Sequence, residues 1–371
     1  MSEFKNLPSG WKVVRLDKVA PLQRGYDLPT NNIKEGLYPV VYSNGILRFH
    51  NEFKAKGPGV ITGRSGTIGK VVYVEEDYWP HNTSLWVTNF YDNNPKFIYY
   101  MYINLNLARF SAGSGVPTLN RNDIHAQTIP LPPLDEQEKI AEILSTWDEA
   151  INLTINLIES KKHFKKALMQ NLLTAKIRFS QFKDEWKEIK LGDFLEEKSE
   201  RNTKNIDLIL SVTNKFGFVT QVEYFDKSVA SDNTANYKIV RKGNFAYNPS
   251  RINVGSIALL ESYEIGILSP MYVVFECLKN LDNRFLKFWF QSHIFMGNLP
   301  KYLAGSVRES LNFNDMKTIS IKLPNLKEQQ KIAEVLTACD DEINLLNLKL
   351  ENLKKQKQGL MQKLLSGKVR I

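Results

Sequence analysis

The sequence has only two cysteines in 371 residues, and Cys277 and Cys339 stand far apart with no Cys-x-x-Cys spacing. A disulfide framework or a structural zinc site needs more cysteines than this, so both are disfavoured and a reducing compartment is favoured. The five histidines form no His-Glu-x-x-His motif or other spaced pair; they are His50, His81, His125, His163 and His293. No metal site is therefore predicted.

Long apolar runs are also missing. No stretch of about 18 apolar residues occurs in the chain, as a membrane-spanning helix would require. The first residues, MSEFKNLPSGWKVV, contain neither the basic nor the apolar region of a signal peptide. We expect a soluble, cytoplasmic protein with no membrane partner.

Motifs for catalysis and cofactor binding are incomplete. Residues 63–71, GRSGTIGKV, resemble a phosphate-binding loop, but Arg64 stands where the first glycine belongs and Val71 replaces the Ser or Thr that binds Mg²⁺. Residues 248–251, NPSR, lack the second proline and the aromatic residue of the Asn-Pro-Pro-aromatic motif of amino-methyltransferases. Residues 113–115, GSG, lack the third glycine of a dinucleotide-binding turn. No catalytic or cofactor-binding residue is predicted, which disfavours an enzyme acting alone.

What the sequence does have is positive charge. The net charge is +9, the pI is near 9.2, and 11% of the residues are aromatic. Basic excess together with aromatic residues favours a polyanionic partner, and nucleic acid is the first candidate. The length exceeds one ordinary core and fits two medium-sized domains with additional elements.

One stretch occurs twice. Residues 131–179 read LPPLDEQEKIAEILSTWDEAINLTINLIESKKHFKKALMQNLLTAKIRF, and residues 323–371 read LPNLKEQQKIAEVLTACDDEINLLNLKLENLKKQKQGLMQKLLSGKVRI. The two align without a gap at an offset of 192 residues, and about half of the positions are identical. Such agreement over this length indicates an internal duplication.

Each copy has an apolar stripe in alternating steps of four and three, which predicts a coiled-coil seam. In the second copy the stripe is Ile332, Leu336, Cys339, Ile343, Leu346, Leu350, Leu353, Leu360 and Leu364, with a polar Lys357 between. In the first copy it is Ile140, Leu144, Trp147, Ile151, Thr154, Ile158, Leu168 and Leu172. We expect Asp135 to cap the first helix together with Glu138, and Gly367 to end the second. Each helix should span about 38 residues, or roughly 57 Å.

Charge along the helices predicts how they pair. The first half of each is acidic and the second half is basic, with clusters such as Lys161, Lys162, Lys165 and Lys166. A parallel pair would bring like charges together, whereas an antiparallel pair sets each acidic half beside a basic half. We therefore predict an antiparallel two-helix coiled coil within the chain. The alternative is two separate amphipathic helices that each cover their own domain.

The duplication extends to the globular regions. Each half opens on a tryptophan, Trp11 or Trp186, followed by short β-rich runs and one helical segment, Pro95 to Arg109 or Asn283 to Ser292. We predict an α+β protein in which two small globular domains are separated by two long helices, with an internal pseudo-two-fold. The four segments are residues 1–130, 131–178, 179–322 and 323–371.

Candidate DNA contacts lie in loops of both globular regions. Arg pairs well with guanine and Asn with adenine, and Gly-Ser loops can present N–H groups to phosphate. In the first region the candidates are Arg64, Ser65, Thr67, Lys70, Ser114, Asn120 and Arg121. In the second they are Arg251, Asn253, Ser306, Arg308 and Asn312. The alternative is that these are ordinary surface loops, in which the Asn side chains satisfy their own backbone.

The repeated LPPLDEQEKIAEIL and LPNLKEQQKIAEVL, the endings LLTAKIRF and LLSGKVRI, and the opening tryptophan of each half resemble the specificity subunit of type I restriction-modification systems. The resemblance covers the whole chain. It implies two target recognition domains that each read one half of a bipartite DNA sequence. It also implies helices that set the spacing and bind two modification subunits, which use S-adenosylmethionine to methylate adenine. Motor-nuclease restriction subunits, which use ATP and Mg²⁺, would complete the complex.

Two other classes compete with this interpretation. A stand-alone or fused DNA adenine methyltransferase would need an S-adenosylmethionine loop and an intact Asn-Pro-Pro-aromatic motif, and neither is present. A coiled-coil scaffold with incidental basic charge would show no salt-dependent duplex binding.

Overall fold

The structure, a computed structural model, describes residues 7–113, 115–220, 233–303 and 310–371. The chain forms two compact units. Unit 1 comprises Met1–Asn156 and Asn347–Ile371, and unit 2 comprises Leu157–Leu346. This grouping differs from the four segments drawn from the sequence, because each unit takes one globular region together with half of each long helix.

Unit 1 contains a four-stranded antiparallel sheet in the order β2-β8-β5-β6. A three-stranded sheet, β4-β3-β7, a β1–β11 pair and a β9–β10 pair complete its strands. The strands are β1 (Lys12–Arg15), β2 (Leu22–Arg24), β3 (Tyr38–Tyr42), β4 (Gly45–His50), β5 (Gly59–Gly63), β6 (Val71–Val74), β7 (Trp79–Pro80), β8 (Ser84–Val87), β9 (Ser111–Ala112), β10 (Thr118–Leu119) and β11 (Thr128–Leu131). The helices of the globular region are α1 (Pro95–Asn104) and α2 (Arg121–His125), with short 3-10 turns at Leu16–Lys18, Thr30–Asn32 and Leu107–Phe110.

Unit 2 repeats this plan. Its four-stranded sheet has the order β13-β20-β17-β18, so the four strands follow one another along the chain in the same order as their counterparts in unit 1. The strands are β12 (Lys187–Lys190), β13 (Leu195–Lys198), β14 (Leu210–Thr213), β15 (Gly217–Thr220), β16 (Lys238–Arg241), β17 (Phe245–Tyr247), β18 (Ile257–Leu259), β19 (Ile265–Leu268), β20 (Val273–Cys277) and β21 (Ser320–Leu323). The helices are α5 (Asn283–Gln291), α6 (His293–Leu303) and α7 (Phe313–Thr318), with 3-10 turns at Leu191–Asp193 and Ile252–Val254. The expected repetition of one α+β plan is confirmed.

The two long helices are α3 (Leu134–Leu173) and α8 (Leu326–Leu365), each of 40 residues. The expected cap at Asp135 is wrong, because Asp135 already lies in the first turn of α3. In α8 the capping side chain is Asn325, whose Oδ1 accepts a hydrogen bond from the Glu328 N–H at 3.0 Å. The helical segment from Pro95 is also shorter than predicted, because Asn106 adopts a left-handed backbone with φ of 48° just after α1.

The predicted seam is observed. Its positions are buried or half-buried along both helices, from Ile140 and Leu144 to Leu172 in α3 and from Ile332 to Leu364 in α8. The antiparallel pairing is visible inside each unit. In unit 1 the Lys357 ammonium pairs with Asp148 at 2.5 Å, and in unit 2 Lys165 pairs with Asp340 at 2.6 Å.

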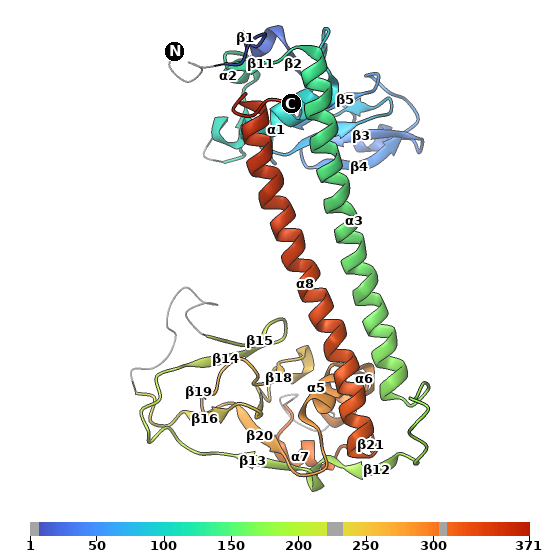
Figure 1. Cartoon of the computed structure of the whole chain (residues 1–371), viewed down its shortest axis with the longest axis vertical. Coiled ribbons are helices and arrows are strands. Elements are labelled where there is room, and N and C mark those ends of the chain that lie inside the picture. Colours follow the sequence, from blue (N-terminus) through green and yellow to red (C-terminus); the bar gives the residue numbers. More distant parts are fainter. Residues whose placement is uncertain (1–6, 114, 221–232, 304–309) are drawn as a thin grey trace. The chain divides into compact units, whose positions relative to one another are not determined.

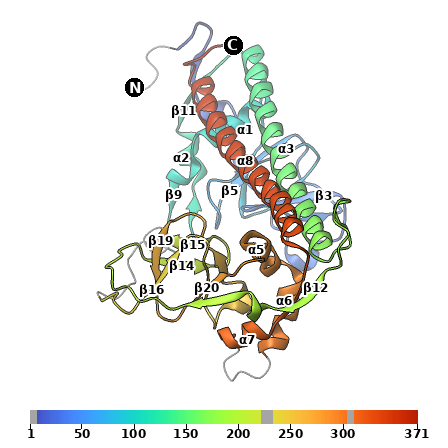
Figure 2. The ribbon, with the colours of Figure 1, turned by 60° about the horizontal axis from the view of Figure 1, so that its bottom comes forward.

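These two ion pairs are the same contact in the two repeats. Each lysine also lies over an aromatic ring of the neighbouring globular region, at 5.0 Å from the centroid of Tyr100 in unit 1 and at 5.1 Å from that of Phe288 in unit 2. Tyr100 belongs to α1 and Phe288 to the corresponding helix α5, which lies beside α8 (Figures 1 and 2). In each unit this lysine, a polar residue within the apolar seam, therefore links both long helices to the globular region.

The Glu-Gln dipeptide repeated near the start of each long helix fixes that helix to its globular region. Gln137 accepts a hydrogen bond from the Asn94 N–H at 3.0 Å and donates to Asn93 Oδ1 and to the Pro132 carbonyl, both at 3.0 Å. Gln329 accepts from the Asp282 N–H at 2.9 Å and donates to the carbonyls of Asn280 at 3.1 Å and Pro324 at 3.0 Å. Both side chains are buried.

The glutamates of the same dipeptide hold the end of the other helix. Glu136 is buried and accepts hydrogen bonds from the Trp11 indole at 2.8 Å and from Arg370, while Glu328 accepts two from Arg178, at 2.9 Å and 2.8 Å. Each arginine follows the C-terminus of the opposite long helix, so the dipeptide ties three elements together in each unit. The Arg178 guanidinium has a raised pKa because of the hydrogen bond to Glu328.

Both long helices end in a left-handed residue, as predicted for the second. Gly367 has φ of 71°, and its N–H donates to the Leu364 carbonyl at 3.2 Å. The corresponding residue in the first repeat is Ala175, which adopts φ of 57° although a Cβ disfavours that conformation.

Each unit has its own large core beneath the four-stranded sheet. In unit 1 it gathers residues of α1, the β1–β11 pair and the paired ends of α3 and α8. In unit 2 it gathers α5, α6, α7 and the corresponding helix ends, with Phe245 stacked on Phe275 at 5.1 Å. Within the described residues no helix is both long enough and apolar enough to cross a membrane.

Candidate nucleic-acid interface

In unit 1 the residues between β5 and β6 form the centre of the candidate site. The Arg64 N–H donates to the Thr83 carbonyl at 2.8 Å, and the Arg64 carbonyl accepts from the Leu119 N–H at 2.8 Å. The Gly66 N–H donates to the Pro117 carbonyl at 3.0 Å. This loop is therefore held on one side by the turn before β8 and on the other by the segment before α2.

The tip of the β3–β4 hairpin joins the same cluster. The Ser43 N–H donates to Thr83 Oγ1 at 3.3 Å, and the Lys70 ammonium donates to the Asn44 carbonyl at 2.6 Å. His81 lies in the adjacent turn and contacts Tyr42, with the ring centroids 4.2 Å apart and the ring planes tilted by 36°. Burial lowers the pKa of His81, which favours its neutral form in this position.

A hollow of about 460 Å³ opens beside this loop. It is lined by Arg24, Arg64, Leu85, Thr118, Leu119, Asn120 and Arg121. Three residues that the sequence singled out, Arg64, Asn120 and Arg121, are thus brought together, whereas Arg24 was missed. Arg24 ends β2, and only the sheet order, which places β2 beside β8, could have revealed it.

The other candidates of the first region have defined surroundings. Ser65 is half-buried and forms a backbone bridge with Thr118, while Thr67 and Lys70 are exposed. Asn120 uses its side-chain oxygen to cap α2, accepting from the Asn122 N–H at 3.0 Å. Ser114 lies outside the described residues.

Unit 2 builds a cluster from the equivalent segments. In the loop between β17 and β18, the Pro249 carbonyl accepts a hydrogen bond from the Leu311 N–H at 3.2 Å. This bond corresponds to the one from the Leu119 N–H to the Arg64 carbonyl in unit 1. Ser256 ends this loop and donates through Oγ to the Val212 carbonyl at 3.0 Å, which anchors it to the β14–β15 hairpin. Asn248 contacts the Met271 sulfur at 3.6 Å across the turn before β20.

The candidates of the second region lie on this cluster. Arg251 and Asn253 are exposed at the 3-10 turn that follows β17. Asn312 is exposed, and its side chain caps α7 by accepting from the Asp315 N–H at 2.9 Å. Ser306 and Arg308 lie outside the described residues. Met271, which is exposed at 60%, was not singled out from the sequence because a lone surface methionine carries no pattern.

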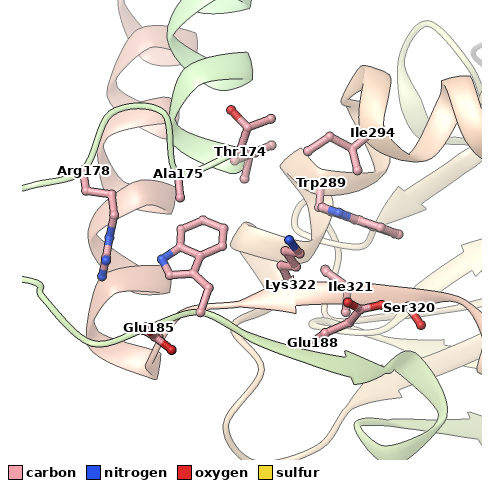
Figure 3. A pocket seen from close by; sticks show the side chains of 12 residues that line it. Thr174, Ala175, Arg178, Glu185, Glu188, Trp289, Ile294, Ser320, Ile321 and Lys322 are labelled. Atoms are coloured by element: carbon pink, nitrogen blue, oxygen red, sulfur yellow. The ribbon is translucent and has the colours of Figure 1, made fainter.

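Another hollow of unit 2 lies away from this cluster and has a different character. It measures about 710 Å³ and is formed by the end of α3, the β12–β21 pair and Trp289 of α5 (Figure 3). Its charged lining residues include two cations, Arg178 and Lys322, and two carboxylates, Glu185 and Glu188. This balance of charge does not favour a polyanion.

Comparison with known proteins gives the same assignment for both halves of the chain. A family model described as the type I restriction modification DNA specificity domain matches residues 8–160 and 183–355. The type I restriction enzyme MjaVIII specificity subunit of Methanocaldococcus jannaschii is 27% identical over 283 residues, which are 70% of this chain and 66% of that protein. The alignment thus spans just under two thirds of that relative.

Two further relatives cover more of the chain. The putative type I restriction enzyme MjaX specificity subunit of the same organism is 27% identical over 346 residues, or 82% of this chain and 76% of that protein. The crystal structure of a type I restriction-modification S subunit from M. genitalium has a similar fold, with a TM-score of 0.64, 16% identity and 98% of both chains covered. The chain belongs to the type I restriction modification DNA specificity family and carries that domain twice.

Proposed function

We propose that this chain is the non-catalytic specificity subunit of a type I restriction-modification complex and that each globular region reads one half of a bipartite duplex. One observation carries the proposal. In both units the loop that joins two strands of the four-stranded sheet, β5–β6 or β17–β18, accepts a backbone hydrogen bond from the segment before a short helix, from Leu119 to Arg64 or from Leu311 to Pro249. The same loop is also bonded to the neighbouring β-hairpin, through Lys70 in unit 1 and through Ser256 in unit 2. Side chains on this shared framework differ, with Arg64 and Arg121 in one unit and Asn248, Arg251 and Asn253 in the other. Such a framework suits two readers of two different sequences.

The chemistry of the two clusters supports DNA as the ligand. Both combine cationic side chains with amide side chains, which are the groups that bind phosphates and the edges of guanine and adenine. Arg64, Ser65, Thr67, Lys70, Asn120, Arg121, Arg251, Asn253 and Asn312 are the proposed contacts among the described residues. Because binding would release counterions from the duplex, the affinity of the assembled complex should fall steeply with salt concentration.

The long helices have a separate role in this proposal. They bind two modification subunits and set the number of unread base pairs between the half-sites. Methylation of adenine with S-adenosylmethionine belongs to those subunits, and cleavage with ATP and Mg²⁺ belongs to the restriction subunits. The complex would act on DNA in the cytoplasm.

Assay of the purified chain alone and after assembly with modification subunits tests this division of labour. We expect neither S-adenosylmethionine binding nor methyl transfer by the chain alone. The assembled complex should methylate adenines at a bipartite sequence. Methyl transfer by the chain without partners would contradict the proposal, as would a complex that methylates without sequence preference.

A further inference from the structure

The arginine-lined hollow of unit 1 differs in charge from the hollow of unit 2 described above. Arg24, Arg64 and Arg121 line its 460 Å³, and none of the described residues that line it is a carboxylate. The larger hollow of unit 2 has two carboxylates, Glu185 and Glu188, among its lining residues beside its two cations. Three arginines that line one space favour an anionic or strongly hydrogen-bond-accepting ligand there.

The three arginines are held in different ways. Arg64 is half-buried, and both of its backbone polar groups are fixed, the N–H to Thr83 and the carbonyl to Leu119, each at 2.8 Å. Its guanidinium therefore projects from a backbone that is anchored on two sides. Because the backbone is held at both polar groups, the point from which the side chain extends is fixed, which favours a contact of defined geometry.

Arg24 and Arg121 are more exposed. Arg24 is paired with Asp27 at 3.1 Å, and Asp27 also accepts a hydrogen bond from Asn82. Arg121 is the exposed first residue of α2. Both lie at the surface beside Arg64, where a sugar-phosphate backbone would pass if the base edge entered the hollow.

We propose that Arg64 reads a guanine in the half-site bound by unit 1, while Arg24, positioned by Asp27, and Arg121 bind the phosphates beside it. Guanine presents two acceptors, O6 and N7, on its major-groove edge, and the two outer N–H groups of a guanidinium match them. Phosphate contacts carry no base information, so the roles of the three arginines can be separated. This inference rests on the proposed DNA-reading function and adds the base and the residue that reads it.

The test uses the complex assembled with its modification subunits and maps methylated sites by sequencing. Variants Arg64→Ala and Arg64→Gln remove the guanidinium, and the glutamine keeps a polar side chain if alanine impairs folding. Arg24→Ala and Arg121→Ala probe the phosphate role. Arg15→Ala is the matched control, because Arg15 is also paired with a nearby aspartate, Asp17, at 3.1 Å, but lies on β1 outside the hollow.

We expect both Arg64 variants to lose a guanine preference at one position of one half-site, by roughly 5- to 150-fold, and to leave the other half-site unchanged. Arg24→Ala and Arg121→Ala should keep the motif but weaken binding at all sites alike. Each should also reduce the slope of log affinity against log salt concentration by about one. Arg15→Ala should leave both motif and affinity unchanged.

Several results would overturn the inference. The half-site bound by unit 1 could contain no guanine, the Arg64 variants could methylate an unchanged motif, or Arg24→Ala or Arg121→Ala could relax a base position. Each of these outcomes leaves the proposed function intact if the unmodified complex still methylates a bipartite sequence. Failure of the unmodified complex to do so would instead reject the proposed function itself.

Discussion

Replacing Gln329 by leucine should loosen the start of α5 selectively. The side chain is 1% exposed, and its three hydrogen bonds join α8 to the Asp282 N–H and to the carbonyls of Asn280 and Pro324. Leucine has a similar volume but no polar atoms, so the change removes hydrogen bonds without opening a large cavity. Asn280 is exposed and can bind water instead, which leaves two backbone groups poorly satisfied. At about 1–2 kcal/mol for each such group, we expect a loss of about 2–4 kcal/mol in local stability.

Hydrogen exchange measures this loss where it occurs. Amides of α5 should exchange between about 30-fold and several hundred-fold faster in Gln329→Leu, since each 1.4 kcal/mol is a factor of ten. Amides of α1 in unit 1 serve as the internal reference and should not change. Gln330→Leu is the matched control, because Gln330 is the next residue of α8 and is exposed. It should change local stability by no more than about 0.5 kcal/mol.

Equal exchange in Gln329→Leu and Gln330→Leu would refute this account of the repeated dipeptide. An increase that appears equally in α1 and α5 would also refute it, because the hydrogen bonds of Gln329 reach only the elements of unit 2.

Two further predictions concern the long helices. Ala175→Gly should raise the free energy of unfolding in urea by up to about 1 kcal/mol, because it relieves the strain of a left-handed backbone. Gly367→Ala should lower the free energy of unfolding, since a Cβ there would lie 2.8 Å from Pro8 Cδ. A destabilising Ala175→Gly or a stabilising Gly367→Ala would contradict the cap assignment. Seven helix-compatible residues inserted after both Asn156 and Leu346 preserve the phase of the seam and lengthen each helix by about 10 Å. The spacer of unread base pairs should therefore grow by about 3 base pairs at 3.4 Å each. Methylation at the original spacing would exclude a spacing role for the helices.

The sequence predicted the long helices, their register and their pairing because a two-in-seven seam and a gradient of charge are properties of the pattern itself. The salt bridges of Lys165 and Lys357 follow directly from that reasoning. The starts of the helices were predicted less well. Asp135 has the chemistry of a cap but lies inside the first turn, since the helix already begins at Leu134.

Contacts between distant segments could not be predicted in the same way. The buried roles of Gln137 and Gln329 depend on which loop packs beside each helix, and no local pattern encodes that neighbour. Arg24 joins Arg64 only because β8 lies between β2 and β5 in the sheet. Loop composition did bring out Arg64 and Arg251. The alternative drawn from the same loops, that their Asn side chains satisfy their own backbone, holds for Asn120 and Asn312, which use their side-chain oxygens as helix caps.

The central claim is that each globular region reads one half-site independently. Exchange of residues 12–130 for the equivalent region of a relative with a different known target tests it most directly, with methylated sites mapped by sequencing the DNA modified by the assembled complex. We predict that one half of the bipartite motif changes to that of the relative while the other half and the spacer stay the same. A change in both halves, or in neither, would contradict the claim.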